Sequence, residues 1–108
     1  MENNYEVAFQ LILHAGNGKS YAMESIKLAR KYQFEEALLN VAEAESEMTK
    51  AHHVQTKLIQ QEASGEKFQL DLIMVHAQDH LSSCMMYIDQ AKEYIYIYKE
   101  LQNLRGGK

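Results

Sequence analysis

The chain has 108 residues, which is enough to bury one modest core, so we expect a single domain over 1–108. Its formal charge is −4, with acidic residues spread along the chain, and this excludes the basic surface on which nucleic-acid binding depends. Proline and tryptophan are absent, Ala, Leu, Glu, Gln, Met and Lys are frequent, and one cysteine excludes an internal disulfide. Long helices without strands are the simplest expectation.

The sequence has no run of roughly 18 apolar residues, the length that a spanning helix requires. The N-terminal residues MENNYE are acidic and polar, unlike the positively charged start of a signal peptide. We therefore expect a cytoplasmic protein. Cys84 lies in an apolar helical stretch, where a reduced and buried thiol is expected.

The first predicted helix covers about 5–31. Its apolar side chains recur in steps of three or four, at Val7, Leu11, Ala15, Ala22, Ile26 and Ala29. Gly16 and Gly18 lie inside this pattern, and each costs about 1 kcal/mol relative to alanine. We expect a local bend or a close helix contact there, without a break. For the nearby His14 we expect no functional role.

The second predicted helix covers about 34–63, after a polar link at 31–33. Its stripe comprises Phe34, Ala37, Leu38, Val41, Ala44, Met48, Ala51, Gln55, Leu58 and Ile59. Ser64 and Gly65 are a natural stop, since glycine accepts the left-handed conformation, and 66–70 is then a loop. The acidic residues Glu43, Glu45 and Glu47 are interpreted as a solvated face.

The third predicted helix covers about 71–103, with Asp71 as a plausible N-cap. Its apolar seam comprises Ile73, Ala77, Leu81, Cys84, Ile88, Ala91, Ile95, Tyr98 and Leu101. Three helices with short links predict an all-α fold, an antiparallel up-down-up three-helix bundle.

A second stripe follows the same helix beside the seam. It comprises Leu72, His76, Asp79, Ser83, Met86, Gln90, Tyr94 and Ile97. A three-helix core is too small to cover the apolar surface of helices this long, so we expect a homo-oligomer. Tyr94, Tyr96 and Tyr98 are interpreted as packing and interface residues.

The segment 74–81, reading MVHAQDHL, gathers four functional side chains in the first turns of the third helix. At about 100° per residue, Asp79 and His80 project to the same side as His76, while Gln78 points to the adjoining groove. An imidazole near a helix N-terminus suits a phosphate, because free N–H groups and the helix dipole favour an anion.

This segment resembles the phosphorylation site of the lactose/cellobiose-type enzyme IIA family of the bacterial sugar phosphotransferase system. Residues 9–20, FQLILHAGNGKS, and 51–65, AHHVQTKLIQQEASG, resemble the family's first and second helices. The resemblance thus spans nearly the whole domain. Lys50 departs from the family pattern, which has an acidic residue before the Ala-His pair.

The resemblance implies a homotrimer of three-helix bundles in which His76 accepts phosphate from phospho-HPr on Nε2, as a tele-phosphohistidine. His76 then passes the phosphate to a cysteine of the IIB component, and the membrane IIC component is an indirect partner. Asp79 is implied to lie near the trimer axis, where three copies bind one divalent cation such as Mg²⁺. Gln78 and His80 are expected to orient the phosphorylated ring. The sugar remains open among lactose, cellobiose, chitobiose and related β-glucosides.

Three alternatives remain from the residues themselves. One is a helical adaptor that uses the third helix without chemistry, and another is a histidine phosphotransfer domain of two-component signalling. The third is a metal-binding bundle in which His76 and His80 are joined by His52 or His53, although a structural role is expected for the latter two.

Overall fold

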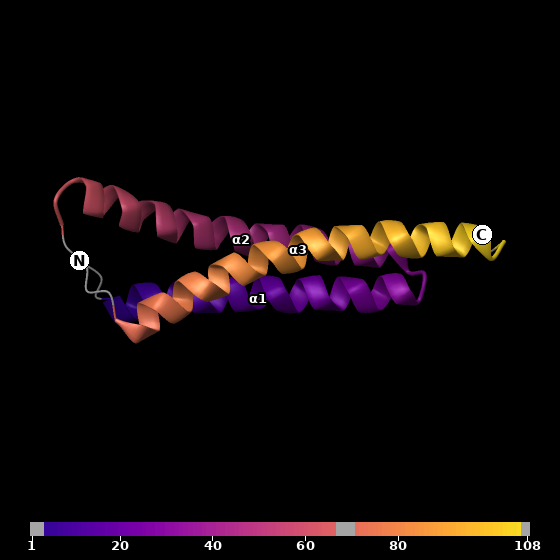
Figure 1. The fold of residues 1–108 in the computed structure, drawn as a ribbon, viewed down its shortest axis with the longest axis horizontal. Coiled ribbons are helices and arrows are strands. Elements are labelled where there is room, and N and C mark those ends of the chain that lie inside the picture. Colours follow the sequence, from indigo (N-terminus) through magenta and orange to yellow (C-terminus); the bar gives the residue numbers. More distant parts are fainter. Residues whose placement is uncertain (1–3, 67–70, 107–108) are drawn as a thin grey trace.

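A computed structural model describes residues 4–66 and 71–106, which form three α-helices. They are α1 (Asn4–Arg30), α2 (Phe34–Ala63) and α3 (Leu72–Leu104), each within one residue of the predicted bounds. The helices run up, down and up in a rod of about 60 × 21 × 16 Å (Figure 1). No strand occurs in these two ranges, so the predicted all-α bundle is confirmed.

The helix α1 is the centre of the bundle, because it packs along both of the others. The helices α2 and α3 diverge toward the end where α3 begins, and the last turns of α3 extend past the turn between α1 and α2 (Figure 1). The first turns of α3 are therefore held mainly by α1. None of the helices described has the length and apolar character needed to cross a membrane.

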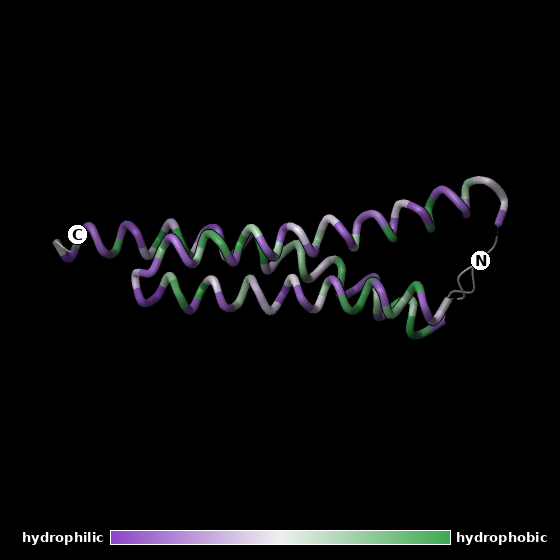
Figure 2. The backbone as a smooth tube through the Cα atoms, turned by 180° about the vertical axis from the view of Figure 1, so that it is seen from behind, coloured by the Kyte–Doolittle hydropathy of each residue, from purple (hydrophilic) through white to green (hydrophobic). Residues whose placement is uncertain are grey.

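Most residues of the predicted stripes form the core, and apolar residues recur along each helix (Figure 2). The prediction is wrong for Leu38 and Ile59 of α2, which are 47% and 59% exposed. Cys84 is fully buried and free, and burial raises the pKa of its thiol, as expected for a reduced core residue. The second stripe of α3 lies outside this core. Within one chain Leu72 is 84% exposed and Met86 is 59% exposed, so α3 presents an apolar outer face.

Gly18 marks the point where α1 touches both neighbours. A Cβ atom at Gly18 would lie 2.6 Å from Cys84 Sγ and 3.4 Å from the carbonyl oxygen of Ala44. At Gly16 a Cβ would meet nothing within 4 Å. The helix continues through both positions, so the predicted close helix contact is confirmed at Gly18 alone.

The helix ends follow the local signals in the sequence. The side chain of Asp71 accepts a hydrogen bond from the backbone N–H of Met74 at 3.1 Å, so the predicted N-cap of α3 is confirmed. The helix α2 stops at Ser64 and Gly65, where the glycine has a φ of +104°. Of the predicted loop 66–70, residues 67–70 lie outside the described residues, as do 107–108 of the tail.

The acidic stretch of α2 contains a buried polar cluster that the sequence analysis missed. Glu47 is 9% exposed, and its Oε1 lies 2.9 Å from His14 Nδ1 and accepts from Asn17 Nδ2 at 3.2 Å, both on α1. Its Oε2 is 3.1 Å from Lys50 Nζ. The hydrogen bond with His14, helped by Lys50 and Asn17 and opposed by burial, lowers the Glu47 pKa to about 2. The prediction of a solvated face is wrong for Glu47.

This cluster also gives Lys50 a role. Its ammonium compensates the buried Glu47 carboxylate on its own helix, so the departure from the family pattern adds a local counter-charge. His14 acts in the structure as a polar link between α1 and α2. Glu45 fits the exposed interpretation better, since it forms a half-exposed ion pair with Lys92 at 2.7 Å.

Candidate functional site

Two histidines on successive turns of α3 form the centre of the site. His76 Nε2 and His80 Nε2 are 3.1 Å apart, and the two rings meet edge to face with centroids 4.5 Å apart. The spacing of four residues places the rings on one face, and helical side chains lean toward the N-terminus, which brings His80 back onto His76. The His76 ring is exposed, whereas His80 is half-buried.

The short distance requires that one of the two Nε2 atoms carries a proton, because two lone pairs cannot form a hydrogen bond. His80 Nδ1 is buried and has no partner among the described residues. A proton on that atom would be an orphaned buried donor, which proteins avoid more strictly than an orphaned acceptor. The arrangement therefore favours His80 Nε2–H as donor and His76 Nε2 as the unprotonated acceptor, whose lone pair points at His80.

Charges of both signs act on this pair. Burial lowers the pKa of His80, and the positive charges of Lys19 and of protonated His76 lower it further, while Asp79 opposes them. A neutral His80 is the result, as the donor arrangement requires. Asp79 itself is exposed and makes no hydrogen bond or ion pair with any residue in 4–66 or 71–106.

Lys19 reaches the site from α1. Its Nζ donates to Ser83 Oγ at 3.2 Å and lies 5.6 Å from the centre of the Tyr87 ring. Ser83 Oγ in turn donates to the backbone carbonyl of His80 at 3.2 Å. Lys19 was not among the predicted site residues, because only the packing of α1 beside α3 brings it to this place.

Gln78 lies on another side of α3. Its Oε1 accepts from Gln55 Nε2 on α2 at 2.8 Å, and its own Nε2 lies 3.9 Å from the sulfur of Met74. The predicted direction toward the adjoining helix is therefore confirmed. The side chain ties the diverging helices α2 and α3 together next to the site, and its predicted role in orienting the phosphorylated ring stays a prediction.

An open apolar hollow adjoins His76. Tyr5, Leu72 and Ile73 line it together with Asp71 and His76, and its empty volume is about 840 Å³. Tyr5 is 61% exposed and stacks on Phe9, with ring centroids 6.2 Å apart. Such exposed aromatic surface beside a reactive group is suited to contact with another protein.

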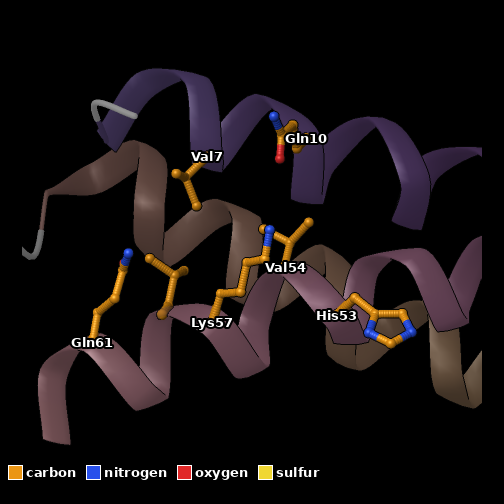
Figure 3. A pocket seen from close by; sticks show the side chains of 7 residues that line it. Val7, Gln10, His53, Val54, Lys57 and Gln61 are labelled. Carbon is orange, nitrogen blue, oxygen red and sulfur yellow. The ribbon is translucent and has the colours of Figure 1, made fainter. Parts of the chain in front are cut away.

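The histidines of α2 do not join the pair. His53 instead lines a small cavity between α1 and α2, together with Val7, Gln10 and Lys57 (Figure 3). Neither His52 nor His53 makes a hydrogen bond or ring contact with His76 or His80 in the described part of the chain. Among these same residues no group of three or more His, Cys, Asp and Glu side chains could hold a metal within one chain.

Comparison with known proteins gives a family match and similar relatives. The family described as "PTS system, Lactose/Cellobiose specific IIA subunit" matches residues 6–99. The lichenan-specific phosphotransferase enzyme IIA component of Bacillus subtilis is 49% identical over 106 residues, which are 98% of this chain and 96% of that protein.

Solved structures share the fold at similar coverage. The cellobiose-specific enzyme IIA from Bacillus anthracis superimposes with a TM-score of 0.92 at 40% identity, over 95% of this chain and 94% of that one. The IIA component in the IIA(chitobiose)–HPr complex of Escherichia coli gives a TM-score of 0.79 at 31% identity, over 94% and 99%.

Proposed function

Because this chain belongs to the lactose/cellobiose-specific IIA family of the phosphotransferase system, we propose that it is a phosphocarrier that works through His76. His76 takes phosphate from phospho-HPr and passes it to the cysteine of a IIB component, which serves the uptake of a β-disaccharide such as lactose, cellobiose or chitobiose. The observation that carries the proposal is an exposed His76 whose Nε2 faces a hydrogen-bond donor from His80.

The chemistry requires little of the protein beyond position. The lone pair of His76 Nε2 attacks phosphorus in line as the bond to the HPr imidazole breaks, and the phosphoryl group moves with its charge spread over three oxygens. Since both rings end neutral, His76 Nδ1 gives up its proton to solvent and the departing imidazole takes one back. His80 Nε2–H, released from His76, is placed to donate to a phosphoryl oxygen.

In this proposal the two supporting residues have different tasks. His80 touches the His76 ring before phosphorylation, and after phosphorylation it holds the phosphorylated ring through the phosphoryl oxygen to which it donates. Gln78 bonds to Gln55 in the unphosphorylated chain, and it contributes to orientation of the ring through the spacing of α2 and α3.

Partner proteins fit the exposed location of His76. A related IIA component was solved in complex with HPr, and we carry that partner over to this chain. The exposed ring of His76 is accessible to HPr and, in turn, to IIB, with membrane IIC reached through IIB. We propose that these phosphate transfers take place in the cytoplasm, and we expect no nucleic-acid partner.

A homotrimer is part of the proposal. The exposed stripe of α3 repeats every seven residues at Leu72, Asp79 and Met86, which is the spacing of a coiled-coil seam. Three copies of α3 packed along this stripe would bring three Asp79 carboxylates together on the axis.

One divalent cation such as Mg²⁺ fits that position, because Asp79 is exposed and unpartnered in the described chain and a hard cation prefers carboxylate oxygens. A single chain offers one carboxylate, so the ion requires several copies. When bound, it would offset the repulsion among the three carboxylates. The phosphoryl transfer at His76 needs no ligand from it.

The test is to incubate the purified chain with phosphoenolpyruvate, enzyme I and HPr, and to locate acid-labile phosphate by mass spectrometry at neutral pH. We expect one phosphate on His76, none in His76→Ala, and normal labelling in His53→Ala, which changes an exposed histidine elsewhere. If HPr is labelled while the wild-type chain stays free of phosphate, the helical adaptor would replace this proposal.

A further inference from the structure

A lysine from α1 is fixed close to the histidine pair. The Lys19 ammonium is held on two sides, by the hydrogen bond to Ser83 Oγ at 3.2 Å and by the Tyr87 ring at 5.6 Å. Ser83 lies one turn beyond His80 and bonds to its carbonyl. The bundle thus places a positive charge beside α3, one turn from the ring that touches His76.

Other lysines near the bundle surface are engaged elsewhere. Lys50 pairs with Glu47, Lys92 pairs with Glu45, and Lys99 lies over the ring of Phe34. Apart from His76 itself, the charged groups that act on His80 are Lys19 and Asp79, which have opposite signs. Among the lysines of the described residues, Lys19 is the one whose charge acts on His80, the ring in contact with His76.

Phosphorylation changes the balance of charge at this place. A phosphoryl group brings about two negative charges, onto a chain whose formal charge is already −4 and onto the helix face that carries Asp79. Without a nearby cation, the phosphorylated state would be disfavoured by repulsion. The long, flexible side chain of a lysine can follow the new charge, since its ammonium is a point charge on four methylene groups.

We propose that Lys19 supplies the positive charge that stabilises the phosphorylated form of His76. It is a positioning residue for phosphoryl transfer, and its ammonium is already hydrogen-bonded to Ser83 Oγ before the phosphate arrives. The inference rests on the proposed phosphocarrier function. A unit charge that acts on a nearby dianion at a protein surface changes an equilibrium about three- to tenfold.

The experiment measures the equilibrium ratio of phosphorylated chain to phosphorylated HPr, by mass spectrometry of mixtures of purified proteins. Lys19→Met is expected to lower the ratio about three- to tenfold, and Lys19→Arg to restore it to within about twofold. Lys27→Met is the matched control, because Lys27 lines the same groove of α1 two turns away. It should leave the ratio unchanged.

High salt distinguishes an electrostatic effect of Lys19 from a packing effect. The deficit of Lys19→Met should shrink toward zero in about 1 M sodium chloride, where the screening length is about 3 Å. The inference is overturned if Lys19→Met has the wild-type ratio, or if its deficit is insensitive to salt and is not rescued by Lys19→Arg. A wild-type chain that takes no phosphate on His76 would instead overturn the proposed function, and this inference with it.

Discussion

Replacement of Gly18 by alanine tests the close contact of α1 with Cys84 on α3. The added Cβ would lie 2.6 Å from Cys84 Sγ, far inside contact distance, and 3.7 Å from Glu47 Cβ on α2. Cys84 is fully buried and its side chain is short, so the sulfur has little room to move. The helices must separate slightly, and the change should destabilise the fold.

The size of the effect is the difference between two terms. Overpacking of a well-packed core costs about 1–3 kcal/mol, while Gly→Ala inside a helix returns up to about 1 kcal/mol. We expect a net loss of about 1–2 kcal/mol for Gly18→Ala. Gly16→Ala is the matched control, since its Cβ meets nothing within 4 Å and only the helix term applies. It should stabilise the protein by up to about 1 kcal/mol.

The assay is chemical denaturation followed by circular dichroism, at one protein concentration because association contributes to stability. In a Cys84→Ala background the sulfur is absent, and Gly18→Ala should lower the free energy of unfolding by less than about 0.5 kcal/mol. Equal stability of Gly18→Ala and Gly16→Ala would refute the reasoning. An unchanged cost in the Cys84→Ala background would show that the clash with sulfur is not the cause.

Three further predictions concern charge and capping. The Glu47 pKa is lowered to about 2 from an ordinary value of 4.5, so the carboxylate stabilises the fold above about pH 4.5, and this stabilisation is lost as the pH falls to 2. In acid denaturation over that range, the free energy of unfolding of wild type should fall by on the order of 3 kcal/mol more than that of Glu47→Gln. Parallel pH profiles for the two proteins would contradict this prediction. Asp71→Ala should cost about 1 kcal/mol in denaturant by removal of the α3 N-cap, whereas Asp71→Asn should keep most of the stability; equal losses would argue against capping. Asp79→Leu should retain or strengthen the trimer while it loses the bound ion, measured by gel filtration and metal analysis, and a shift to monomer would speak against the axial position.

The sequence alone was sufficient for the helices and for most of their inner faces. Helix bounds agreed within one residue because local signals define them: Asp71 as N-cap, Gly65 in a left-handed conformation, and regular steps of three and four in α3. The placement of His76 and His80 on one face follows from helical periodicity in the same way. Periodicity is a property of one helix and needs no partner.

Contacts between helices could not be derived in this way. The burial of Glu47 with His14, the arrival of Lys19 at Ser83, and the different environments of Gly16 and Gly18 each depend on the rotation and register of α1 against its neighbours. A rotation of a few tens of degrees would move any of these side chains from a buried contact to solvent, with no change in the helical pattern. Only the tertiary structure decided them, because packing of three long helices selects one rotation from many that the sequence pattern allows.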